Sequence, residues 1–80
     1  KLRRGKFDLV EEKVAPNAIA SGKQLKDLQL PDQTTIVAVI RSGELIIPSG
    51  DFQFEAADEV LAVVHSSQKK DLAKFFDRVI

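Results

Sequence analysis

The chain has 80 residues, of which 44% are hydrophobic, and its 12 basic and 12 acidic side chains leave a formal net charge of zero. A chain of this length forms one domain, near the size at which a single hydrophobic core becomes marginal without extra support. The balanced charge gives no net attraction to nucleic acid or to an anionic membrane, and the lack of cysteine excludes disulfides and thiolate metal sites. We therefore expect a small globular domain from a reducing compartment.

The first six residues, KLRRGK, are basic and precede the first predicted strand. We interpret residues 1–6 as a linker from a preceding domain, because short basic runs are usually solvated chain. A surface that meets acidic lipid or an acidic partner is the alternative. The chain begins with lysine, and we hypothesise that it is part of a longer protein. Residues 7–80 then form the domain itself, and no apolar run in them is long enough to cross a bilayer.

The first part of the domain predicts one strand and one short helix. In residues 7–14, Phe7 and Leu9 fall on one face and Asp8 and Glu12 on the other, with Val10 and Val14 as exceptions, which predicts a half-buried edge strand. Pro16 ends it because proline cannot donate to a ladder. Residues 21–28 predict a helix of about two turns that Ser21 caps. Such a short helix is unstable alone in water, so we expect its leucines to pack on the sheet.

Residues 34–51 predict a β-hairpin and carry the most apolar strand of the chain. The run 34–41 is rich in β-branched residues, Ser42 and Gly43 form the turn, and residues 44–48 return as the second strand. Strict alternation divides the first strand into two faces, with Ile36, Ala38 and Ile40 on one and Thr35, Val37, Val39 and Arg41 on the other. Both faces are apolar, so this strand needs cover on two sides.

A further strand and a closing helix complete the predicted fold. Residues 59–65 again have apolar side chains on both faces, and Ser66 or Ser67 caps a helix over residues 68–80. That helix has one apolar stripe, formed by Leu72, Phe75, Phe76, Val79 and Ile80. We predict an α+β fold with a small, mostly antiparallel sheet of about four strands, a short helix after the first strand and a C-terminal helix packed on one face. The other face is left for a partner.

The residues that could carry chemistry do not form a recognised catalytic or metal-binding pattern. His65 is the single histidine and lacks neighbouring ligands at metal-binding spacing, so we interpret it as structural, with pH sensing as the alternative. The glycines stand too far apart for a phosphate-binding loop, and Asp58 and Glu59 are adjacent, which sends them to opposite sides of a strand. We predict no enzymatic activity, no cofactor and no metal.

Arg41 ends the first strand of the hairpin and lies across the predicted turn from Glu44. We favour an exposed ion pair between these two residues, because such surface pairs are common. The alternative is that the guanidinium binds a phosphate or an acidic group of a partner, for which its forked donors are suited.

The order of these elements, together with several residues, resembles the RCK C-terminal domain, also called TrkA-C. This family occurs in regulators of potassium channels and transporters and in the tails of some antiporters. The resemblance runs from Leu9 to the last helix, and its pieces are Gly22-Lys23-Gln24-Leu25, Leu28, Leu30, Ile36 to Arg41, Gly43, Pro48, Asp51, Asp58, Leu61 and Val63. Ala57 and His65 depart from it, because many relatives have glycine at each position.

The resemblance implies a cytoplasmic regulatory domain, associated with the inner face of the membrane through a channel or transporter subunit and usually preceded by an RCK N-lobe. It also implies a homodimer, in some members with a small ligand such as cyclic di-AMP or a divalent cation in the dimer cleft. Candidate ligand-binding residues are Ile36, Arg41 and Pro48, and candidate dimer-interface residues are Val37 and Val39. Only Ile36 matches the pattern of members that hold cyclic di-AMP, so we do not expect that ligand, and we expect no nucleic acid.

Two functions follow from these expectations. The first is a ligand-sensing, dimerising domain of a potassium or other monovalent-cation transport protein, which acts because a ligand favours one dimer arrangement over another. The second is a dimerisation module without a ligand of its own. Both functions require a sheet face that the chain itself leaves uncovered.

Overall fold

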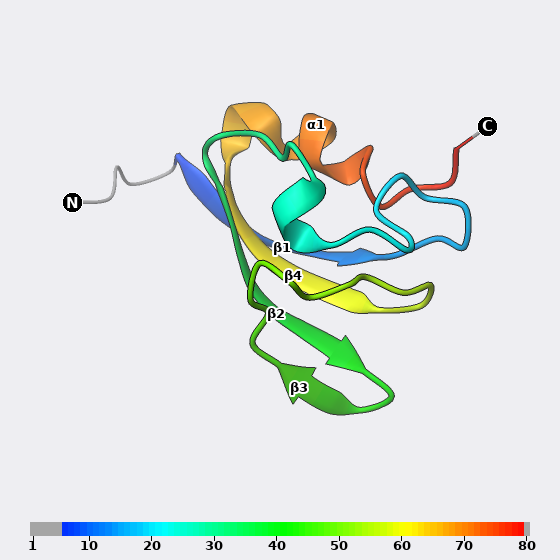
Figure 1. Ribbon diagram of the computed structural model, residues 1–80. Helices are drawn as coiled ribbons and strands as arrows, with labels where there is room; N and C mark the ends of the chain where they lie inside the picture. The colour runs from blue at the N-terminus through cyan, green and yellow to red at the C-terminus, as the bar shows by residue number, and fades with distance from the viewer. Residues whose placement is uncertain (1–5, 80) are drawn as a thin grey trace.

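A computed structural model of the chain describes residues 6–79 as a four-stranded antiparallel sheet with short helices on one side (Figure 1). The strands are β1 (Phe7–Lys13), β2 (Thr34–Arg41), β3 (Glu44–Ile46) and β4 (Glu59–His65), in the spatial order β1-β4-β2-β3. The predicted α+β architecture is confirmed, although β1 ends one residue and β3 two residues earlier than predicted. The predicted linker lies outside the described residues except for Lys6.

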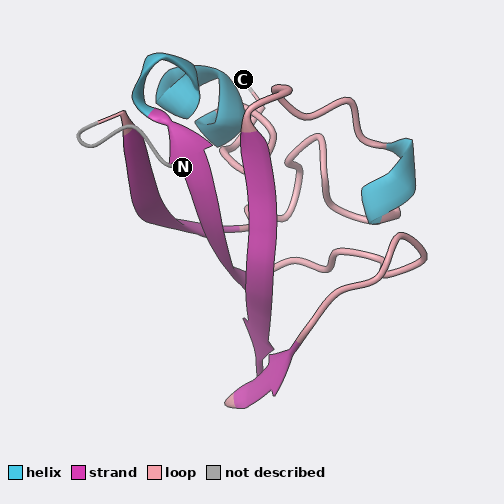
Figure 2. Cartoon of the chain, turned by 90° about the vertical axis from the view of Figure 1, so that its left-hand side faces the viewer, coloured by secondary structure: helices cyan, strands magenta, loops and turns pink. Residues whose placement is uncertain are grey.

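β4 is a central strand, because it pairs with β1 on one side and with β2 on the other. Its alternate residues Val60, Ala62 and Val64 are fully buried, which marks one face of the sheet as the inner face. Figure 2 shows that the helices and long loops lie on this one side of the strands. The side chains that they contribute to the core include Phe54, Leu72 and Phe76.

The prediction of a helix over residues 21–28 with Ser21 as its N-cap is wrong in both the length of the helix and the capping residue. It is a single 3-10 turn, η1 (Leu25–Asp27), which Gln24 precedes without a side-chain cap. The backbone of this region bonds to another segment instead: Gly22 N–H donates to the Phe54 carbonyl, Leu25 N–H to Phe52 and Lys26 N–H to Gly50, and Phe54 N–H donates back to Lys23. These long-range bonds use the groups that a longer helix needs for itself.

The predicted C-terminal helix is also shorter than expected. A 3-10 turn, η2 (Ser66–Gln68), leads into α1 (Lys69–Ala73), and the residues after α1 form turns. The carbonyls of Phe75 and Phe76 accept hydrogen bonds from Ala20 and Ala15, so they are unavailable to continue the helix. Leu72 and Phe76 are nevertheless fully buried, as the apolar stripe predicts. Ile80, the last predicted helical residue, lies outside the described residues.

A β-bulge in β2 changes which of its side chains face the core. Its pairing with β4 shifts by one residue between Ile36 and Ala38, so Val37 is an extra residue in the strand. The shift reverses the alternation: Ile36 and Val39 both face the inner side, whereas Ala38 and Ile40 face the opposite side. The prediction that Val37 and Val39 share a face through strict alternation is therefore wrong.

Ala57 adopts a positive φ of 76° in the turn before β4. A residue with a Cβ atom is strained there by about 1–2 kcal/mol, whereas glycine is not, although glycine has a larger unfolded-state entropy. We predict that Ala57→Gly raises the free energy of unfolding by roughly 0.5–1 kcal/mol, as measured by urea denaturation.

The neighbouring substitution Ala56→Gly is the matched control, because Ala56 is not among the described residues with positive φ. Glycine there relieves no strain and adds unfolded-state entropy, so we expect a small loss of stability. Equal effects of the two substitutions would contradict a strained backbone at Ala57.

Candidate functional site

Arg41 lies at the end of β2 and forms the densest polar cluster of the inner side. Its Nε donates to Asp58 Oδ1 at 2.8 Å and its Nη2 to Asp58 Oδ2 at 2.7 Å, a two-pronged ion pair. The same Nη2 donates to the Gln53 carbonyl at 2.9 Å, and Nη1 lies 3.4 Å from Glu55 Oε2. The guanidinium carbon also lies 4.9 Å from the centre of the Phe52 ring. The Arg41 donors are thus largely used within the chain.

Asp58 is the acidic residue that the chain buries most completely, with 1% of it exposed. Burial by itself raises the pKa of Asp58, but hydrogen bonds from Arg41 and from the Glu55 backbone N–H hold the pKa below its ordinary value of 3.8. The hydrogen bond to Asp58 raises the pKa of Arg41 in turn. Both groups are therefore charged at neutral pH, and a buried charge of this kind is tolerated because it is paired and hydrogen-bonded.

The predicted surface pair between Arg41 and Glu44 is wrong, because Arg41 reaches across the inner side to Asp58 instead. In the sequence, Asp58 stands out only as a matching family position and as the neighbour of Glu59. One signal could have found the pair: Asp58 directly precedes the apolar strand β4, and Arg41 ends β2, its antiparallel neighbour. Such ends lie side by side in a sheet.

The three candidate ligand-binding residues do not form one site. Ile36 is half-buried and packs against the core at the start of β2, and Pro48 is half-buried just beyond β3. The printed register of β2 and β3 ends at the pair Val39–Ile46, so strand pairing does not set Pro48 beside Ile36. Arg41 is at the opposite end of β2, about 15 Å from Ile36 along the chain. Arg41 is thus separated from Ile36, and a ligand site shared by Ile36 and Pro48 stays a prediction.

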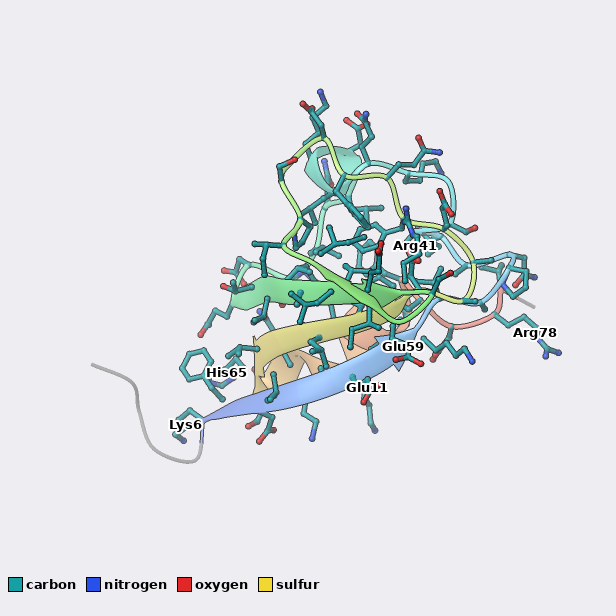
Figure 3. All side chains as sticks on the ribbon, turned by 90° about the horizontal axis from the view of Figure 1, so that it is seen from below. Lys6, Glu11, Arg41, Glu59, His65 and Arg78 are labelled. Atoms are coloured by element: carbon teal, nitrogen blue, oxygen red, sulfur yellow. The ribbon has the colours of Figure 1, made fainter. Side chains whose placement is uncertain are left out.

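The face of the sheet opposite the core is apolar and has no covering layer among residues 6–79. We call it the outer face, and the strand register assigns to it Leu9, Ala38, Ile40, Leu45, Leu61 and Val63. Leu9 and Leu45 are 68% and 62% exposed, and the bulged Val37 is 41% exposed. Figure 3 shows this side of the sheet, with Glu11, Glu59 and His65 among the labelled residues on β1 and β4.

The two candidate interface residues, Val37 and Val39, differ in burial. Val37 is exposed, so its place in a dimer interface stays a prediction. Val39 is fully buried in the core of the chain itself, and its side chain is not available to a partner. The bulge explains why Val39 is buried, because it turns the Val39 side chain inward while the strand continues in the same direction.

His65 uses its ring within the chain. Nδ1 accepts a hydrogen bond from the Ser67 backbone N–H at 3.1 Å and lies 2.8 Å from Ser67 Oγ, so it caps η2. The ring also meets Phe7 edge to face, with centroids 5.2 Å apart. Among the residues that the structure describes, no group of three or more His, Cys, Asp or Glu side chains is arranged to hold a metal ion. These contacts favour the structural interpretation of His65.

Comparison with protein-family models identifies the chain. Residues 9–77 match the model described as the TrkA-C domain. The chain belongs to the TrkA-C family. The resemblance seen in the sequence is therefore confirmed, including its extent.

The relatives are potassium uptake proteins. The chain is 32% identical over 91% of its length to the Trk system potassium uptake protein TrkA of Mycobacterium tuberculosis (strain H37Rv), covering 33% of that protein. It is 34% identical over 88% of its length to the Trk system potassium uptake protein TrkA homolog of Archaeoglobus fulgidus, covering 16% of it. The chain thus spans about a third or less of these relatives.

A solved structure described as "Structure of RCK domain with cda" has the same fold. Its TM-score against this TrkA-C domain is 0.77, with 23% identity over 86% of this chain and 97% of that one. At this sequence identity the match shows only that the two chains share a fold. Within residues 6–79 no helix is long and apolar enough to cross a membrane.

We predict that Arg41→Leu lowers the free energy of unfolding by about 3 kcal/mol at neutral pH, because it leaves the Asp58 carboxylate buried without its partner. The matched control is Lys26→Leu, which breaks an ion pair with Asp51 whose side chains are 55% and 79% exposed. Exposed pairs contribute about 1 kcal/mol or less, so the control remains close to the parent chain in urea denaturation.

We predict that the loss of unfolding free energy in Arg41→Leu depends on pH. The depressed pKa of Asp58 stabilises the parent chain above the unfolded pKa, and this contribution is lost as pH falls through the folded pKa. In Arg41→Leu, burial without a partner raises the Asp58 pKa, so acidification stabilises that variant relative to the parent. The difference in unfolding free energy between the two chains should therefore narrow from pH 7 to about pH 4. A difference that stays constant over this range would contradict the assigned charge state.

Proposed function

We propose that this TrkA-C domain is a regulatory domain of a potassium or other monovalent-cation transport protein, and that it pairs with a second copy and responds to a small ligand. The observation that carries the proposal is the family match over residues 9–77, together with relatives that are Trk system potassium uptake proteins. On this proposal the domain is cytoplasmic and meets the inner face of the membrane through its transport partner or a preceding RCK N-lobe.

The uncovered outer face supports the pairing part of the proposal. Leu9 and Leu45 are exposed on it, and half-buried Leu61 and Val63 lie between β1 and β2. Exposed apolar side chains gathered on one face are typical of a surface that meets a partner. Val37 belongs to the same exposed region as a candidate interface residue.

The proposed ligand response places Ile36 and Pro48 near the ligand. Ile36 lies in β2 and Pro48 follows β3, so a ligand that contacts both residues would report on the arrangement of the hairpin. On this proposal Arg41 does not contact the ligand. Its N–H groups donate to Asp58 and to the Gln53 carbonyl, so the side chain holds the hairpin in position rather than binding a phosphate. A ligand that binds one dimer arrangement better shifts the population that the transport partner meets.

The alternative is a dimerisation module without a ligand. The pairing surface serves it equally well, and the commitment of Arg41 to Asp58 favours it over a phosphate sensor. A ligand screen separates the two functions.

We predict that at least one of potassium, a divalent cation, a nucleotide or a cyclic dinucleotide raises the melting temperature of the chain. A ligand at 100 times its dissociation constant adds about 2.7 kcal/mol to the stability of the folded state, which is a rise of roughly 10–20 °C for a domain of this size. Pro48→Ala should reduce the rise, whereas Lys74→Ala, at the exposed residue that caps the C-terminus of α1, should leave it intact. A dimer that none of these compounds stabilises supports the ligand-free module.

We predict that Leu45→Asp shifts the chain from dimer towards monomer in light scattering, because it places a charge in the apolar region proposed to meet the second copy. The matched control is Ile19→Asp, since Ile19 is 46% exposed in the loop between β1 and η1 and not on the outer face. A parent chain that is monomeric at every accessible concentration would overturn the pairing proposal directly.

A further inference from the structure

The sheet has two edges, and they differ in how well they could pair with another strand. β1 forms one edge and β3 the other. A strand at an edge leaves a row of backbone N–H and C=O groups without partners, and another strand can pair with that row. Which edge is open to pairing depends on the side chains along it and on the direction of its free backbone groups.

The turn between β2 and β3 determines the free groups of β3. Ser42 and Gly43 have φ values of 51° and 80°, as in the two-residue turn whose twist matches a hairpin. In such a turn the residue after it donates to the residue before it, so Glu44 bonds back to Arg41. Hydrogen-bonded pairs alternate along the ladder, so Glu44 and Ile46 bond to β2. Leu45, and Ile47 just beyond β3, then direct their N–H and C=O groups to the open edge.

We propose that β3 pairs antiparallel with β3 of a second copy, centred on Ile46, so that the two sheets join into one of eight strands. This proposal rests on the pairing part of the proposed function and specifies its geometry. With Ile46 on the two-fold axis, Leu45 of each copy lies opposite Ile47 of the other, and both are hydrogen-bonded pairs. The register thus uses the backbone groups that β2 leaves free.

The side chains favour this register. Leu45 and Ile47 are 62% and 71% exposed, the two most exposed large hydrophobic residues of the hairpin, and pairing buries both against each other in each half. Glu44 lies away from Glu44 of the second copy, opposite its Pro48. Proline at that position removes no needed donor, because residues with even numbers direct their backbone groups to β2.

The other edge strand, β1, is protected against pairing with a second copy. Four of the seven residues of β1 are charged, namely Asp8, Glu11, Glu12 and Lys13. The register that pairs the whole strand with itself is centred on Val10 and sets Asp8 opposite Glu12 of a second copy, and like charges directly opposite are destabilising. Charged side chains along an edge are a known means of preventing association. β3 has only one charge, at its first residue.

The decisive experiment is a cross-link in a chain that has no cysteine of its own. At the two-fold axis Ile46 faces itself in a non-hydrogen-bonded pair, where the Cα atoms are about 4.5 Å apart, within the span of a disulfide. Ile46→Cys should therefore form a covalent dimer under mild oxidation at concentrations where the parent chain dimerises. Leu9→Cys, 68% exposed on β1, is the matched control and should form far less.

The outcomes separate this proposal from the proposed function. A covalent dimer of I46C above the level of L9C supports pairing through β3. If the parent chain is a dimer but I46C does not exceed L9C, pairing through β3 is overturned, while dimerisation and ligand response stand. If the parent chain is always a monomer, this proposal and the pairing part of the proposed function both fall, and the ligand screen still tests the sensor.

Hydrogen exchange on the parent chain gives a second test that needs no substitution. Pairing with β2 protects the amides of Glu44 and Ile46 at every concentration. Pairing with a second copy protects those of Leu45 and Ile47 only when the chain is dimeric. The expected result is slowed exchange at these two amides as concentration rises, by the factor by which the dimer outnumbers the monomer. Exchange at Leu45 and Ile47 that stays fast in the dimer would overturn the proposal.

Discussion

The fold depends most on Asp58, because this residue joins three segments that are distant in the sequence. Its carboxylate binds Arg41 at the end of β2, its carbonyl accepts from Val14 N–H just after β1, and its backbone leads into β4. A buried carboxylate is tolerated only where such partners surround it, so the ends of all three strands are fixed together. The strained turn at Ala57 lies next to this junction and is held in place by it.

The covering layer of the sheet is made mostly of loops rather than helices. Segments 14–30 and 47–58 bond to each other through their backbones and bring Phe54 into the core, while α1 supplies Leu72. Within residues 6–79 this layer covers only the inner face. The hairpin projects beyond it at one end of the molecule (Figures 1 and 2).

The sequence predicted the four strands, their antiparallel arrangement and the burial of Leu72 and Phe76, because hydrophobic periodicity is a local signal, whereas Val79 of the same predicted stripe is 49% exposed. It predicted the helices too long, because hydrogen bonds to distant segments outweigh local propensity: the N–H groups of Gly22 and Lys26 donate to such segments, and the carbonyl of Phe76 accepts from Ala15. The choice of Ile36 and Pro48 as ligand-binding residues came only from the family resemblance and stays a prediction. It missed the Arg41–Asp58 pair and misplaced Val39, because a pair 17 residues apart and a one-residue bulge leave no periodic trace.

The bulge at Val37 also determines where the hairpin points. A bulge bends its strand and increases the local twist, so the part of β2 beyond it leaves the plane of the first half and carries β3 with it. The orientation of β2 and β3 beyond the bulge therefore depends on a single inserted residue, Val37. A movement of the loop layer near Ile36 would be enlarged at the tip of the hairpin, whereas a regular strand would transmit it unchanged. One residue thus determines the angle at which this TrkA-C domain presents its edge to a neighbour.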